Sequence, residues 1–172
     1  HSYIAYFQAF TNTYAPVEYL RQIYMEAIQD PDVQILSIAT RPDCLPDDVL
    51  QLLEEINQIK PVWVELGLQT IHPQTATYIR RGYPLEVFEE AVNNLRKRNI
   101  SVITHTILGL PGENEDMMLE TIDYLNKMDI QGIKLQLLHI LKGTDLALDY
   151  EKQPFWSPAM EEYISLLGKC IA

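Results

Sequence analysis

The chain has 172 residues, of which 47% are hydrophobic, so it can bury a sizeable core, and its length favours one domain over residues 1–172. Its net charge of −11 argues against a nucleic-acid surface, which needs a basic footprint. No run approaches the roughly 20 apolar residues that cross a membrane, and the two cysteines, Cys44 and Cys170, lie too far apart in the sequence for a CxxC metal site. We therefore expect a cytoplasmic protein with no membrane partner, and we expect this chain by itself to have no nucleic-acid partner.

Apolar and β-branched runs alternate along the chain with segments of helical periodicity. Strands are predicted at Tyr3–Phe10, Val33–Thr40, Val62–Leu68, Ser101 to the break at Gly109, and Gly132–Ile140. Helices are predicted from Pro16 to about Gln29, Asp47 to Ile59, His72 or Pro73 to Arg81, Pro84 to Arg98, Asn114 to about Met128, and Pro158 to Cys170. Strand starts recur roughly every 30 residues, as in repeated βα units that form a parallel sheet. The pattern indicates an α/β fold with five parallel strands and flanking helices, and it fits an open barrel and a doubly wound sheet equally well.

The stretch Ser101–Glu113 predicts the position of a ligand site. A strand rich in β-branched residues breaks at Gly109-Leu110-Pro111-Gly112, and the loop opens a helix whose first turn is acidic. In α/β proteins ligands bind where the carboxyl ends of strands meet helix N-termini. The two glycines of this loop are explained equally well by turn geometry alone.

Motifs at the ends of all five predicted strands point to one family. They are Gln8-Ala9-Phe10-Thr11-Asn12-Thr13, Ala39-Thr40-Arg41-Pro42-Asp43, Gly67-Leu68-Gln69-Thr70, Leu108-Gly109-Leu110-Pro111-Gly112-Glu113 and Ile140-Leu141-Lys142-Gly143-Thr144. Together they resemble the radical S-adenosylmethionine (SAM) superfamily, and most closely bacterial iron–sulfur oxidoreductase-like proteins related to the Elp3, HemN and MiaB-type enzymes. The resemblance implies a partial (β/α)6 barrel, truncated at its N-terminal strand, with SAM lying across the carboxyl ends of the strands.

The resemblance also assigns cofactor-binding roles to individual residues. They are Thr11, Asn12 and Thr13 for the methionine amino group, Arg41 for a carboxylate of SAM or substrate, Gln69 for the ribose or methionyl part, Ile107 and Gly109 along the adenine, and His139 within the Leu138–Ile140 backbone at the adenine edge. His105 stands where a GxIxG-type strand has its first glycine. The resemblance identifies no catalytic residue.

The family signature CxxxCxxC, whose three thiolates hold a [4Fe–4S] cluster, does not occur in this sequence. The resemblance therefore implies that the Tyr3 strand corresponds to the family's second strand and that the cluster strand lies upstream. We expect this chain alone to bind no cluster, to be inactive, and to self-associate through the exposed edge of the Tyr3 strand.

The resemblance implies that the full-length protein is an iron–sulfur oxidoreductase-type enzyme. With an external electron donor, it would generate a 5′-deoxyadenosyl radical from SAM and abstract hydrogen from a substrate that the sequence does not identify. Two other functions stay open: a cluster-free α/β-barrel enzyme that binds phosphate at Gly109–Gly112, and a non-catalytic binding module.

Several candidate residues also have plain structural interpretations. His72, His105 and His139 lack metal-ligand spacing and are expected to be ordinary hydrogen-bonded histidines. Arg41 would satisfy carbonyls at its strand end, and Asn12-Thr13 would cap the following helix.

Overall fold

The computed structural model describes residues 1–172 as an α/β protein with one five-stranded sheet in the order β1-β2-β3-β4-β5. The strands are β1 (Tyr3–Phe7), β2 (Val33–Thr40), β3 (Val62–Gln69), β4 (Ser101–Leu108) and β5 (Gly132–Leu137). The helices are α1 (Val17–Gln29), α2 (Asp47–Asn57), α3 (Pro73–Tyr78), α4 (Leu85–Arg96), α5 (Glu115–Asn126), α6 (Asp145–Lys152) and α7 (Met160–Ile171), with a 3-10 turn, η1, at Pro42–Cys44. The β1–β2 and β2–β3 pairs are parallel. None of the helices combines the length and the apolarity needed to span a bilayer.

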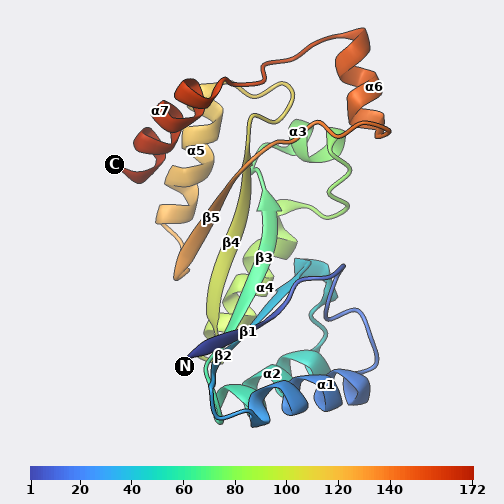
Figure 1. Cartoon of the computed structure of the whole chain (residues 1–172), viewed down its shortest axis with the longest axis vertical. Coiled ribbons are helices and arrows are strands. Elements are labelled where there is room, and N and C mark those ends of the chain that lie inside the picture. Colours follow the sequence, from blue (N-terminus) through green and yellow to red (C-terminus); the bar gives the residue numbers. More distant parts are fainter. The chain divides into compact units, whose positions relative to one another are not determined.

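The chain forms two compact units. The first contains residues 1–68, 83–105 and 129–134. Its helices α1 and α2 lie side by side (Figure 1), and each buries one apolar stripe, such as Leu20 and Tyr24 on α1. In β3, Val62, Val64 and Leu66 are fully buried, as expected for a parallel strand covered by helices.

The second unit contains residues 69–82, 106–128 and 135–172. Here α5 packs beside α7 (Figure 1). Leu108 at the end of β4, Met118 of α5 and Leu166 of α7 form a small apolar core. This packing uses the amphipathic face predicted for the C-terminal helix.

The structure corrects several predicted boundaries. The first and last strands end at Phe7 and Leu137, three residues before the predicted ends at Phe10 and Ile140. Phe10 adopts a φ of 57°, which is incompatible with a strand. The β-favouring sequence YIAYFQAF is therefore longer than the strand that it forms. The sequence interpretation also missed α6, whose first turn is capped by the Thr144 side chain.

Candidate functional site

A polar cluster in the first unit takes one side chain from each of the five strands. Phe7 contacts Tyr24 of α1 with 5.0 Å between ring centroids, so the adjacent Tyr6 points to the opposite face of the sheet, here called the inner face. The residues that meet on the inner face, here called the Glu65 cluster, are Tyr6 (β1), Ser37 (β2), Glu65 (β3), His105 (β4) and Lys134 (β5).

The carboxylate of Glu65 is the centre of this cluster. It accepts hydrogen bonds from Ser37 Oγ at 2.7 Å and Tyr6 OH at 3.1 Å. His105 Nε2 lies 2.6 Å and Lys134 Nζ 3.0 Å from its Oε2 atom. The Lys134 ammonium also lies over the Tyr6 ring, 5.0 Å from its centroid.

These contacts determine the charge of Glu65. Burial raises its pKa, but hydrogen bonds from Ser37, His105 and Lys134 outweigh burial and lower the pKa to about 2. Burial lowers the pKa of Lys134, and the contact with Glu65 outweighs it, so that pKa is raised. The cluster therefore contains a carboxylate and an ammonium group that both stay charged near neutral pH.

The loop after β1 packs on the end of β2. Thr13 is 2% exposed, and its hydroxyl donates to Cys44 O and is 2.6 Å from Thr40 Oγ1. Asn12 Oδ1 accepts from the hydroxyl of Tyr24 at 2.8 Å. The interpretation of Asn12-Thr13 as a helix cap is wrong, because α1 begins after Pro16 and has no side-chain cap.

Arg41 follows β2 and pairs with Asp43 instead of strand carbonyls. Its Nε and Nη2 atoms lie 2.9 and 2.6 Å from the two carboxylate oxygens of Asp43. The hydrogen bonds from Arg41 lower the pKa of Asp43 despite its partial burial. An incoming carboxylate would have to compete with Asp43 for this guanidinium group.

An open pocket of about 900 Å³ lies beside this loop, and Thr13, Tyr14, the η1 turn and α4 line it. Its wall contains Asp43 and Glu90, so it offers no cationic side chain to an anion.

In the second unit, two strand ends have backbone conformations that L-residues rarely adopt. Gln69 has a φ of 64° at the end of β3, and the structure gives its side-chain amide no hydrogen-bond partner. Gly109, just after β4, has a φ of 86°, as does Gly112, so both positions have the left-handed backbone that favours glycine in a turn. Ile107 is half-buried on β4, and His139 is exposed after β5.

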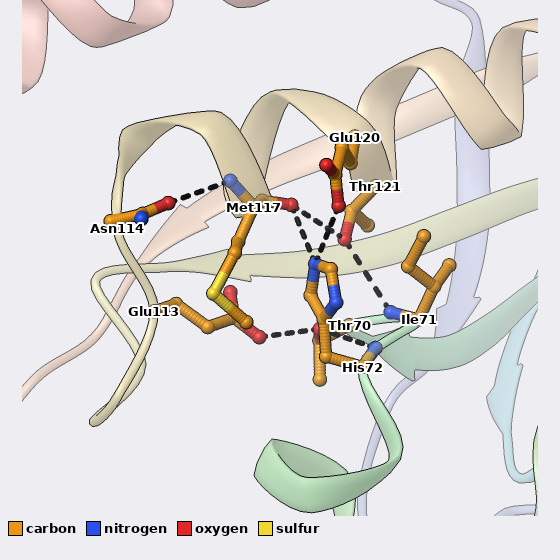
Figure 2. A network of polar contacts seen from close by, with 8 residues as sticks. All are labelled: Thr70, Ile71, His72, Glu113, Asn114, Met117, Glu120 and Thr121. Carbon is orange, nitrogen blue, oxygen red and sulfur yellow. Dashed lines mark hydrogen bonds and ion pairs between the residues drawn. The ribbon is translucent and has the colours of Figure 1, made fainter.

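Figure 2 shows a polar network that ties the Gly109–Gly112 loop and α5 to the end of β3. The Glu113 carboxylate, 8% exposed, accepts from the Thr70 hydroxyl. His72 Nε2 lies 2.8 Å from Met117 O, and Asn114 caps α5 by accepting from Met117 N at 3.0 Å. The hydrogen-bonded interpretation is therefore confirmed for His72, and the contact with Glu65 confirms it for His105.

The residues of this chain do not fit an iron–sulfur cluster. Its two cysteines are both free, and burial raises the pKa of each thiol, which disfavours the thiolate that iron requires. No group of three or more His, Cys, Asp and Glu side chains is placed to hold a metal ion.

Comparison with known proteins identifies the family. Residues 2–125 match the Radical SAM superfamily, so the chain belongs to that superfamily. It is 51% identical over 165 residues to the uncharacterized protein YtqA of Bacillus subtilis, covering 96% of this chain and 51% of YtqA. It is 40% identical over 170 residues to YhcC of Escherichia coli, covering 98% of this chain and 55% of YhcC. The chain therefore spans about half the length of these relatives.

The fold agrees with this assignment. The structure of Elp3 from the archaeon Methanocaldococcus infernus superposes with a TM-score of 0.82 at 19% identity, covering 97% of this chain and 44% of Elp3. This likeness confirms the predicted fold class, a radical SAM-type partial barrel with five parallel strands.

The sequence interpretation missed the Glu65 cluster. His105 was considered, but Tyr6, Ser37, Glu65 and Lys134 were not. One signal was available: Glu65, His105 and Lys134 each place an ionisable side chain in the middle of a predicted strand, and buried strands rarely contain charged residues without partners.

Proposed function

We propose that this chain is the SAM-binding part of a radical SAM enzyme that abstracts hydrogen from its substrate. The observation that carries the proposal is the family match over residues 2–125, which includes four of the five predicted strand-end motifs. SAM, when bound to a reduced [4Fe–4S] cluster and supplied with an external electron, provides the 5′-deoxyadenosyl radical that abstracts hydrogen. This chain's own residues would bind and orient SAM and exclude water.

The proposed SAM contacts are the residues assigned by resemblance, namely Thr11, Asn12, Thr13, Arg41, Gln69, Ile107, Gly109 and His139. The structure supports Gln69 best, because its amide has no partner and its strained backbone is typical of functional positions. It supports Thr13 least as a side-chain ligand, because its hydroxyl is already used by Thr40 and Cys44. We assign Thr13 to holding the loop in place.

The three cluster thiolates would come from residues outside this chain. The relatives are about twice as long as the matched region, which leaves ample sequence for them. We place the whole protein in the reducing cytoplasm, where free thiols and thiolate-bound clusters persist.

A phosphate-binding loop at Gly109–Gly112 is disfavoured by charge. The loop is followed by the buried carboxylate of Glu113 and by Glu115 and Asp116 in the first turn of α5. These three acidic side chains would repel a phosphate from the helix N-terminus that normally attracts it.

The test uses the longer parent protein, purified without oxygen and supplied with iron and sulfide. We expect reductant-dependent conversion of SAM to 5′-deoxyadenosine, and loss of this product when the cysteines of the cluster motif are changed to alanine. A reconstituted protein that neither holds a cluster nor forms 5′-deoxyadenosine would refute the proposal.

A matched pair of variants tests the SAM site itself. Gln69→Ala should raise the KM for SAM about fivefold to tenfold, the effect of losing one hydrogen bond. Gln74→Ala, an exposed position on α3, should leave KM unchanged. Equal KM values for SAM in the two variants would show that Gln69 does not bind SAM.

A further inference from the structure

We propose that Glu65 and His105 form a carboxylate–imidazole pair in which His105 is a catalytic base and Glu65 its positioning residue. His105 would take a proton from a hydroxyl or amine group of the substrate. The inference rests on the proposed function, since it requires the substrate to lie on the inner face of the sheet.

The geometry leaves one nitrogen of His105 ready to accept a proton. Nε2 lies 2.6 Å from Glu65 Oε2, and the side chains are 15% and 10% exposed. An ionised carboxylate can only accept a hydrogen bond, so Nε2 carries the donated proton, and in the neutral imidazole Nδ1 then has the lone pair. The structure gives Nδ1 no hydrogen-bond partner.

Glu65 is not itself the base. Four donors surround its two oxygens: Tyr6 OH, Ser37 Oγ, His105 Nε2 and Lys134 Nζ. Its pKa of about 2 leaves it ionised, and too weakly basic to retain a proton near neutral pH. It is suited to fixing the orientation and tautomer of His105.

Stability alone does not explain the pair. On the neighbouring positions of β3, Val64 and Leu66 are completely buried and apolar. Buried ion pairs can often be replaced by packed apolar side chains without loss of stability. A polar cluster assembled from all five strands is therefore better explained by a chemical role.

The proposed step transfers only a proton. The O–H or N–H bond of the substrate breaks, the heteroatom keeps the electron pair, and a new N–H bond forms at His105 Nδ1. The positive charge of the resulting imidazolium is neutralised by the adjacent Glu65 carboxylate, and no oxidation or reduction takes place. The substrate class is thus a molecule with a hydroxyl or amine group, whose deprotonation accompanies hydrogen abstraction from carbon.

The test needs neither SAM nor substrate, so its failure is distinguishable from failure of the proposed function. Nitrogen-15 NMR of the imidazoles in this 172-residue chain, with His105 identified by loss of its signal in His105→Gln, reads the tautomer directly. Reaction with diethyl pyrocarbonate, followed by mass spectrometry of each histidine-containing peptide, measures how fast the imidazole nitrogen lone pair of each histidine reacts.

His72 is the internal reference, because its side chain is also 15% exposed but its Nε2 atom bonds to the Met117 carbonyl at 2.8 Å, and its nearest carboxylate, that of Glu120, is 3.8 Å away. We expect His105 to carry its proton on Nε2 and to react at least about threefold faster than His72, because the Glu65 carboxylate, 2.6 Å from Nε2, holds the ring in the tautomer that exposes the Nδ1 lone pair. Glu65→Gln should reduce the rate at His105 to that of His72, whereas Glu55→Gln, which alters an exposed carboxylate outside the cluster, should preserve it. A proton on Nδ1, or a wild-type His105 that reacts no faster than His72, would overturn the proposal even if Glu65→Gln does not fold.

Discussion

Two buried polar side chains on neighbouring strands, Glu65 and Thr104, differ in whether they have hydrogen-bond partners. Glu65 has four hydrogen-bond donors, whereas the Thr104 hydroxyl in the next strand is completely buried without a partner. A buried polar atom contributes to stability only when it is paired, so the two residues should respond oppositely to removal of their polar groups.

Glu65 should make folding stability sensitive to acid. Its pKa is about 2 in the folded protein and near 4.5 in an unfolded chain, so unfolding takes up a proton between these values. The stabilisation is complete above pH 4.5 and is lost as the pH falls toward 2. Glu65→Gln should therefore lower the free energy of unfolding by about 2 kcal/mol at pH 7 and flatten its acid dependence.

Urea unfolding at a series of pH values measures this effect. Glu55→Gln is the control, because Glu55 also accepts a hydrogen bond from a cationic side chain, that of Arg21, but is exposed. Its replacement should change stability much less. If the free energy of unfolding of Glu65→Gln falls with decreasing pH just as it does in the wild type, the lowered pKa of Glu65 is contradicted.

Thr104→Val should stabilise the protein. The replacement keeps the β-branched shape and removes an unpaired buried hydroxyl, so the free energy of unfolding should rise by about 1 kcal/mol. Thr40→Val, which removes a hydroxyl that is hydrogen-bonded to Thr13, should lower it by a similar amount. Thermal or urea denaturation compares the two, and a destabilised Thr104→Val variant would show that its hydroxyl has a partner.

Among the secondary-structure elements, starts were predicted better than ends. All five strand starts agree with the sequence interpretation, because each begins an apolar or β-branched run after a turn. The ends of β1 and β5 were not predictable from composition. The residues that follow these strands, Gln8–Phe10 and Leu138–Ile140, also have a composition that suits a strand, but they lie outside the hydrogen-bonded sheet. The helix α6 was missed because its short sequence buries no residue.

The N-terminus of α5 should depend on Asn114. Its side chain satisfies the backbone N–H of Met117, so Asn114→Ala should lower the free energy of unfolding by about 1 kcal/mol. Asn126→Ala, at the exposed last residue of the same helix, is the matched control and should be nearly neutral. Circular dichroism during thermal unfolding measures both, and equal effects would exclude a capping contribution.

For the molecule as a whole, family and fold class could be predicted because motifs at strand ends depend on local sequence. The sequence shows ionisable residues within strands but does not show that they meet, because the members of the Glu65 cluster are up to 128 residues apart and only the sheet brings them together. The extent of the domain and the roles of Thr11, Arg41 and the other cofactor residues stay predictions.

The edge strand β1 should mediate self-association of this chain. Tyr3 and Ile4 are 55% and 49% exposed on a strand with one unpaired edge. Ile4→Lys should shift the protein toward monomer in sedimentation velocity at tens of micromolar. Ile59→Lys, which charges a similarly exposed isoleucine after α2, should leave association unchanged. Wild-type protein that sediments as a monomer would refute this prediction.

The Glu65 cluster also has a consequence for synthesis of the chain on the ribosome. The first unit is assembled from three segments, and the last of them ends at Lys134. Tyr6 and Glu65 leave the ribosome well before the lysine that pairs with them, at separations of 128 and 69 residues. Until Lys134 emerges, the nascent sheet holds a carboxylate without its cation, so the first unit is completed only after residue 134 has been synthesised.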